Sequence, residues 1–448
     1  MYGRTTRIEL FSLSTIPMRV FHLSWMAFFV CFFAWFAVAP LMPVIRADLQ
    51  LTKDQIANIN IAAVGVTIFV RLLVGPLCDR YGARLTYTWL LLLGALPVFA
   101  IGLAHSYPAF LLCRLCIGAI GASFVITQFH TSSMFAANVV GTANATAAGW
   151  GNAGGGATQM LLPLILSAIV GMGVSQAFGW RLSMIVPGIL MWIMAWLYYR
   201  YAKDTPQGNL NDVKHALAAQ PVRNGALESF LLAAGNYRVW MLFVTYGACF
   251  GIELTIHNLA ATYYVDRFGL DVRTAGLYAG SFGLLALFAR ALGGIVSDRV
   301  AHSRGLDGRT RLLFGLILIE GLGLMVFAHM DTAQTALLAM LGFGLFTHMA
   351  CGATYSLTPF IDRRALGGVA GIIGAGGNVG AVAAGFVMKG ANSVNHGLFI
   401  LGIAVTASAF CAAAVRFGAE HRRDERESYD SALLAREASE SIAVGATA

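Results

Sequence analysis

The sequence is poor in charged residues. Asp, Glu, Lys and Arg make up only 12% of its 448 residues, about half the share found in soluble globular proteins. It has no glycine period, which excludes a collagen-like fibre, and its seven scattered cysteines do not form a disulfide framework. A hydrophobic content of 58% excludes a disordered chain. Because so little charge is available to cover a water-exposed surface, we expect a polytopic membrane protein.

Long apolar runs predict twelve membrane-spanning helices. A helix needs about 20 apolar residues to cross a bilayer, so twelve crossings take about 240 residues and leave ample chain for loops. The expected fold is therefore an all-α membrane protein. The predicted spans, with ends placed to within about 2–4 residues, are 20–44, 56–77, 87–105, 108–136, 141–170, 180–202, 237–265, 273–299, 311–329, 334–358, 365–390 and 395–417.

The net charge of +8 is distributed unevenly between the two sides of these spans. The side that holds both termini carries 21 of the 30 Lys and Arg residues, the other side carries six, and three lie within spans. Cytoplasmic loops carry the excess of Lys and Arg, so we expect a multi-pass protein of the cell (inner) membrane with both termini in the cytoplasm. The positive charge therefore indicates topology and not nucleic-acid binding.

The two halves of the chain repeat each other. An arginine, glycine, aspartate and arginine at offsets 0, 4, 8 and 9 occur twice, 219 residues apart, as Arg71, Gly75, Asp79 and Arg80 and as Arg290, Gly294, Asp298 and Arg299. The motif Gly-Asn-x-Gly occurs at 151–154 and again 226 residues later, at 377–380. We therefore predict two homologous six-helix bundles, 1–202 and 237–417, joined by a polar cytoplasmic linker, 203–236, and followed by a cytoplasmic tail, 418–448.

Several motifs carry a resemblance to a known family. Residues 75–84 (GPLCDRYGAR) resemble the loop motif of the major facilitator superfamily, and Arg114 with Gly118 resembles its fourth-helix motif. Residues 148–159 (AGWGNAGGGATQ) and 374–380 (GAGGNVG) resemble the two nitrate signatures of the nitrate/nitrite porter family, as does 39–43 (APLMP) followed by Asp48. The resemblance extends to about residue 417. It implies two pseudo-symmetric bundles with a substrate site between them, and conformational gating by Asp79, Arg80, Arg84, Arg114, Asp298 and Arg299.

Arg71 and Arg290 lie within apolar spans, where a charged side chain costs about 2.5–3.5 kcal/mol. The acids within spans, Glu253 and Glu320, are fewer than the three arginines there, which include Arg114. The forked guanidinium group matches the oxygens of a carboxylate, nitrate or phosphate. We therefore expect Arg71 and Arg290 to bind an anion between the halves. The alternative is that both pair with acids or carbonyls and lock the halves together.

Glycine accounts for 50 residues and clusters around Gly151 and Gly377. Small residues let helix backbones approach closely, which predicts a narrow site for a small anion, although close packing alone would equally explain the glycines. Asn152 and Asn378 favour the anion site, because a buried amide needs a partner and can donate to an oxyanion. We place all four residues in the predicted substrate site.

Aromatic and histidine side chains complete the candidates. The resemblance implies that Phe124 stacks against the planar ion, with core packing as the alternative, and that Tyr246 is a candidate hydroxyl donor. His130, His257 and His348 are expected to be packing groups, because a lone histidine within a span is more often a satisfied core residue.

The expected function is secondary active transport of nitrate, or of nitrate and nitrite, by alternating access in a monomer. Importing an anion against an inside-negative potential costs about 2.3 kcal/mol per 100 mV. Glu253, near the middle of its span, is therefore the candidate for proton coupling by symport, with an interhelical hydrogen bond as its alternative role. Exchange of nitrate for nitrite, or transport of another small anion such as a carboxylate, remain alternatives. No enzyme activity, cofactor or metal is expected, because no span carries a nucleophile with its base or a metal-ligand cluster.

Overall fold

Helices make up nearly all regular structure in the computed structural model, which describes residues 4–136, 139–210, 226–362, 365–423 and 426–427. Within these residues, β-structure is limited to the isolated bridges Thr5–Phe135 and Thr205–Gly208. The helices are α1 (Ile16–Trp35), η1 (Ala39–Leu41), α2 (Met42–Leu49), α3 (Lys53–Tyr81), α4 (Ala83–Ala100), η2 (Ile101–Leu103), α5 (Tyr107–Gly118), η3 (Ala119–Ala122), α6 (Ser123–Met134), α7 (Val140–Gly171), α8 (Gln176–Ser183), α9 (Ile185–Tyr201), α11 (Ala226–Ala234), α12 (Tyr237–Phe268), α13 (Val272–Leu284), α14 (Ala286–Phe327), α15 (Ala333–Leu357), η4 (Thr358–Phe360), α16 (Leu366–Gly390) and α17 (Val394–Ala414).

Eleven helical segments among the described residues are long and apolar enough to cross a membrane. One of them, Val272–Phe327, has 56 residues and would be about 84 Å long if straight, about twice the thickness of a bilayer. It bends at Gly305, whose backbone is not helical (φ 57°, ψ −152°). This segment is therefore long enough for two crossings, and with it the described residues provide for the twelve predicted crossings.

Two boundaries differ from the sequence-based prediction. The residues between the predicted spans 273–299 and 311–329 are helical and belong to α14, so the loop expected there is reduced to the bend at Gly305. The first predicted span, 20–44, begins earlier and is interrupted after Trp35, where α1 gives way to η1 and α2. The charged residues around Gly305 indicated a loop, although the chain is helical on both sides of that glycine. The apolar run that continues past Trp35 concealed the end of α1.

Local hydrogen bonds explain several helix ends. The Thr52 hydroxyl accepts from the backbone N–H of Gln55 at 3.3 Å, and the Gln55 side chain accepts from the Thr52 N–H at 3.0 Å, a capping box that begins α3. Asp271 begins α13 by accepting from the N–H of Arg273 and from Thr274. The hydrogen bond from the Thr274 hydroxyl holds the pKa of the Asp271 carboxyl below its usual value.

The distribution of polarity is that of a membrane protein. Large apolar side chains such as Phe69, Leu72 and Trp196 are exposed on the outside, where lipid replaces water as the surrounding medium. Arginine, glutamate and asparagine side chains are instead buried between the helices. The functional candidates therefore lie inside the bundle.

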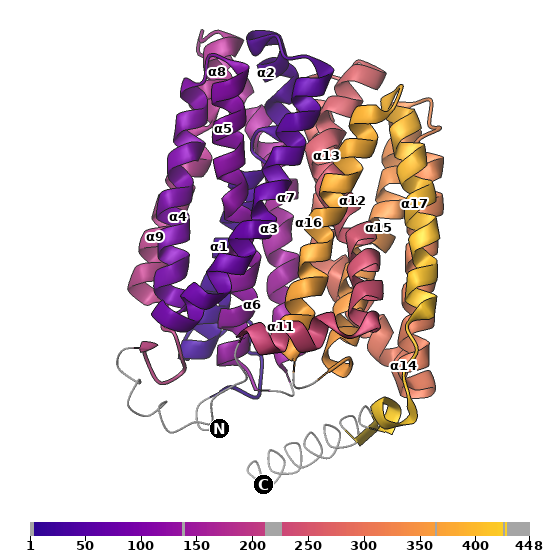
Figure 1. Ribbon diagram of the computed structural model, residues 1–448. Helices are drawn as coiled ribbons and strands as arrows, with labels where there is room; N and C mark the ends of the chain where they lie inside the picture. Colours follow the sequence, from indigo (N-terminus) through magenta and orange to yellow (C-terminus); the bar gives the residue numbers. More distant parts are fainter. Residues whose placement is uncertain (1–3, 137–138, 211–225, 363–364, 424–425, 428–448) are drawn as a thin grey trace, which may run out of the picture.

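Helices α1–α9 gather on one side of the molecule and α12–α17 on the other (Figure 1). The start of α1 and the end of α17 lie at the same end of the bundle, the lower end in Figure 1, which we call the terminal face. Helices α2 and α8 lie at the other end, which we call the opposite face. Residues 211–225 of the predicted linker 203–236 lie outside the described residues. The linker contains α11, and Ser229 of α11 accepts a hydrogen bond from the N–H of Gly368 on α16. Most of the predicted tail also lies outside them.

Candidate anion site between the two halves

Arg71 of α3 is buried and has no carboxylate partner in the part of the chain that the structure describes. Its Nη1 donates to the carbonyl oxygen of Gly374 at 2.9 Å, and its Nη2 donates to that of Gly121 at 3.4 Å. Gly374 belongs to α16 in the other half, so this contact crosses the interface. Among the described residues Arg71 forms no ion pair, and its Nε has no hydrogen-bond partner. Its positive charge is therefore uncompensated.

Arg290 of α14 has the opposite environment. Its Nη2 donates to Oε2 of Glu253 on α12 at 2.5 Å, and the glutamate side chain is fully buried. A buried ion pair of this geometry compensates the charge of Arg290. The alternative, in which the arginines lock the halves together, requires an acid or carbonyl partner at each arginine, and both arginines have one. Within the described ranges, only the partner of Arg290 is an anion.

The internal repeat explains this asymmetry. The two Gly-Asn signatures pack against Phe28 of α1 and Phe250 of α12, so these helices correspond at a separation of 222 residues. At that separation Glu253 corresponds to Cys31. The acid that accompanies Arg290 thus has no counterpart beside Arg71, and the two symmetric arginines differ in charge balance.

The two signature asparagines also differ. When the Asn152 amide is oriented so that its oxygen faces Arg290, that oxygen accepts from Nη2 at 2.5 Å, Nε at 3.0 Å and Nη1 at 3.2 Å. Asn378 is equally buried, yet neither its amide nitrogen nor its oxygen has a partner among the described residues. It follows Gly374, the acceptor of Arg71, by one helical turn of α16. Asn378 is therefore an unoccupied hydrogen-bonding group on the Arg71 side.

Aromatic rings cover both guanidinium groups. The Phe124 ring centroid lies 5.4 Å from Cζ of Arg71, and the Phe250 centroid lies 5.3 Å from Cζ of Arg290. Tyr246 stacks on Phe250 at 5.2 Å and meets Tyr355 edge-on at 5.1 Å, while Tyr355 lies 6.1 Å from Phe124. The structure thus brings Phe124 and Tyr246 together with the arginines.

Sequence reasoning missed Phe250 and Tyr355. The repeat offers a signal for the first, because Phe250 corresponds to Phe28 behind the first signature. No signal in the sequence marks Tyr355. The signature glycines Gly151 and Gly377 face these phenylalanine rings, so they position aromatic residues rather than present backbone to a ligand.

The predicted gating residues occupy several places. Arg114 is fully buried on α5, where it donates to the carbonyl oxygen of Trp35 and, at 2.9 Å, to Oδ1 of Asn258 in the other half. Asp298 pairs with Arg309 at 2.6 Å across the bend of α14.

The remaining gating candidates lie at the terminal face. The N–H of Arg84 donates to Oδ1 of Asp204 at 2.8 Å, and the Arg84 guanidinium lies 4.7 Å from the Tyr199 ring centroid. Asp79, Arg80 and Arg299 are exposed. A Cβ at Gly82, which has φ +85°, would collide with the Asp204 carboxylate, so glycine is required at this turn.

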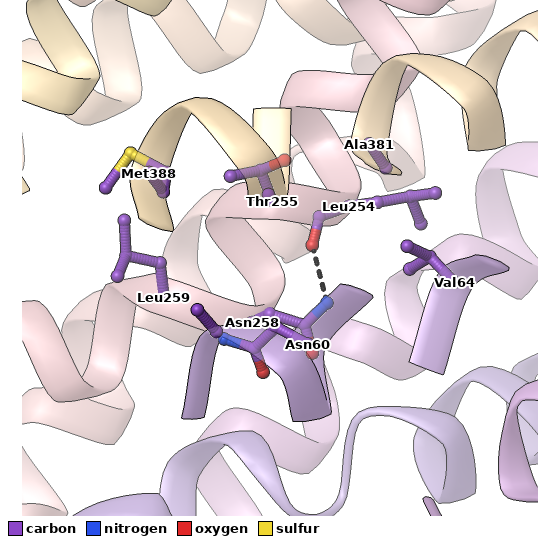
Figure 2. A pocket seen from close by; sticks show the side chains of 10 residues that line it. Asn60, Val64, Leu254, Thr255, Asn258, Leu259, Ala381 and Met388 are labelled. Atoms are coloured by element: carbon purple, nitrogen blue, oxygen red, sulfur yellow. Dashed lines mark hydrogen bonds between the residues drawn. The ribbon is translucent and has the colours of Figure 1, made fainter. Parts of the chain in front are cut away.

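A cavity of about 50 Å³ lies between the halves (Figure 2). Asn60 and Val64 of α3 line it together with Asn258 of α12 and Ala381 of α16. Asn258 donates to the carbonyl oxygen of Leu254 at 3.0 Å, the dashed line in Figure 2. A volume of this size holds only a few water molecules.

The family model described as Major Facilitator Superfamily matches residues 24–385. The high affinity nitrate transporter 2.5 of Arabidopsis thaliana is 41% identical over 380 residues, which cover 85% of this chain and 75% of that protein. The chain belongs to the nitrate/nitrite porter family of the major facilitator superfamily. The resemblance found in its motifs is thereby confirmed.

The porter is similar to bacterial proteins as well. It is 28% identical over 452 residues to the nitrate/nitrite transporter NrtP of Nostoc punctiforme, covering 84% of this chain and 87% of that one. Two solved structures share its fold. A bacterial homologue of the lysosomal transporter Spinster, inward-facing and occupied, has a TM-score of 0.69 at 13% identity (91% and 98% covered), and a D-xylose–proton symporter has 0.67 at 15% (89% and 97% covered).

Proposed function

We propose that this porter transports nitrate by alternating access and binds the ion between Arg71 and Arg290. The observation that carries the proposal is the buried Arg71 guanidinium, whose hydrogen-bond partners among the described residues are carbonyl oxygens alone. One of them belongs to Gly374, one helical turn before Asn378, whose amide has no partner in the same described ranges. An anion at this place supplies the missing charge and a hydrogen-bond acceptor. The names of the relatives support nitrate as that anion.

The shape of the site supports a small planar ion. The rings of Phe124 and Phe250 lie over the two guanidinium groups, and a planar ion can stack between aromatic faces while its edge oxygens accept from forked donors. Tyr246 and Tyr355 add hydroxyl groups beside the same rings. Nitrite has the same planar edge, so we include it as a second substrate.

We propose that the terminal face is cytoplasmic in the cell membrane, in agreement with its excess of Lys and Arg. Residues 1–202 and 237–417 are the moving units, 203–236 joins them, and one chain suffices. Arg46 pairs with Asp266 at 2.6 Å, and Lys389 donates to Asn58 at 2.9 Å, both across the interface near the opposite face. The outward-opening step has to break these contacts.

We propose proton symport as the coupling mode. Proteoliposomes without internal nitrite are expected to accumulate labelled nitrate when the outside is made acidic, because a co-transported proton offsets the charge of the anion. Uptake that ignores the imposed gradient and requires internal nitrite would establish exchange instead. A porter that accumulates a small carboxylate but not nitrate would overturn the substrate assignment.

Asn378→Ala is expected to weaken nitrate binding by about tenfold, the loss of one hydrogen bond to a charged group. Its thermal stability in detergent is expected to stay unchanged or to rise, because the substitution removes a buried amide that has no partner. Isothermal titration and a melting curve measure the two effects. Asn152→Ala is the matched control: it removes an acceptor of Arg290 and is expected to lower stability.

A further inference from the structure

We infer that His348 of α15 holds the coupled proton, with Glu253 as its counter-ion, and that this proton releases Arg290 to bind nitrate. The inference rests on the proposed nitrate transport. It assigns to His348 a role beyond the packing expected of it, and it changes the role of Glu253 from proton carrier to shared acceptor.

The hydrogen bonds of His348 fix its tautomer. Its Nε2 lies 3.1 Å from the carbonyl oxygen of Phe282 on α13, and a carbonyl only accepts, so Nε2 carries a proton. Its Nδ1 lies 3.4 Å from Oε2 of Glu253 and has no hydrogen-bond partner. In the neutral ring the Nδ1 lone pair therefore faces a carboxylate oxygen. A proton added at Nδ1 converts this repulsion into a charge-assisted contact.

Oε2 of Glu253 is shared by several donors. Arg290 donates to it at 2.5 Å, and the Sγ of Cys351 lies 3.7 Å away. Nitrate and this carboxylate therefore compete for one guanidinium group. When His348 is protonated, the imidazolium becomes a second cationic partner of Glu253, and donors of Arg290 become available to the incoming anion.

The charge count couples one proton to one nitrate. Arg71, Arg290 and Glu253 give the empty site a formal charge of +1. One nitrate and one proton together leave that charge unchanged. The site therefore has the same net charge when it is loaded and when it is empty. The membrane potential then does not oppose transport of nitrate together with a proton. By linkage, protonation tightens nitrate binding and nitrate tightens proton binding by the same factor.

Other titratable groups surround the pair. They are Tyr246, Cys249 and His257 on α12, Arg290 and Glu320 on α14, and Cys351 on α15. Helix α13 contributes the Phe282 carbonyl. Among the described residues His257 forms no ion pair, and its ring packs against Phe36 and Phe282, with centroids 4.8 and 5.8 Å away. It is therefore a matched control: it is equally buried and lies one helical turn from Glu253 on α12, but its ring nitrogens make no hydrogen bond or ion pair with any described residue.

The test uses the full-length porter in proteoliposomes with two readouts. Counterflow of labelled nitrate against internal nitrate reports folding and the proposed transport, and stimulation by an acidic exterior reports proton coupling. His348→Gln is expected to bind and exchange nitrate more weakly but still measurably, because its amide can donate to Glu253 without a proton, and to lose the stimulation completely. His257→Gln is expected to keep both. Stimulation that survives in His348→Gln, or that disappears only in Glu320→Gln, would overturn the inference. Wild-type porter without counterflow would instead refute the proposed function.

A binding measurement covers the case in which His348→Gln does not fold. When nitrate is added to purified wild-type porter in weak buffer, the porter is expected to take up one proton for each nitrate ion that it binds. The Kd for nitrate is expected to rise by up to tenfold for each unit of increasing pH as the site deprotonates. Nitrate binding that takes up no proton would contradict proton coupling at this site.

Discussion

Arg71→Lys is expected to reduce nitrate uptake by about tenfold to more than a hundredfold, because it removes a charge-assisted contact of about 1.5–3 kcal/mol. Lysine keeps the positive charge but loses the planar fork. Arg71 donates to the carbonyl oxygens of Gly374 and Gly121 from two separate nitrogens, and lysine has a single side-chain nitrogen in their place. The initial rate of labelled nitrate uptake into proteoliposomes, measured over a range of concentrations, gives the effect.

Arg290→Lys is also expected to reduce nitrate uptake, although the lysine ammonium group can still pair with Glu253. Arg200→Lys is the control, because Arg200 is exposed near the end of α9 and lies beside Tyr201 rather than the anion site. Wild-type kinetics in Arg71→Lys would show that this guanidinium does not hold the substrate. Membrane insertion of each variant is checked by its yield and its elution as a single peak.

Gly156→Leu is expected to abolish transport. A Cβ at Gly156 of α7 would lie 2.6 Å from the backbone nitrogen of Leu284 and 2.7 Å from the carbonyl oxygen of Gly280, on α13 of the other half. These are backbone atoms and cannot move aside, so a branched side chain forces the helices apart. The halves can then no longer approach as each conformational cycle requires. Nitrate counterflow measures the loss.

Gly171→Leu is the matched control for this substitution. Gly171 ends the same helix, and a Cβ there meets no atom within 4 Å. The Gly171→Leu variant is expected to transport nitrate at the wild-type rate. If Gly156→Leu also transports normally, α7 and α13 do not form a tight interface during the cycle. A thermal melting curve separates a blocked cycle from a porter that fails to fold.

The architecture was largely predictable because it depends on quantities that are local in sequence. Lipid requires long apolar helices whose backbone bonds are internal, so the spans could be placed from composition alone. The repeated arginine and Gly-Asn motifs revealed two halves, and family membership is confirmed by the relatives. The interruption near Gly305 was predicted as a loop, but its charged residues did not reveal that the helix continues on both sides of the bend.

By itself the sequence determined the membrane class, the two repeated halves and the presence of two buried arginines at matching positions. Only the tertiary structure decided that Arg290 has Glu253 and Asn152 as partners while Arg71, as far as the described residues show, has carbonyl oxygens alone. It also decided that His348 faces the same carboxylate. These contacts join helices from distant parts of the chain, and Asn152 and Arg290 even belong to different halves. Spacing along one helix fixes which side chains share a face, but which faces meet is decided by how the helices pack.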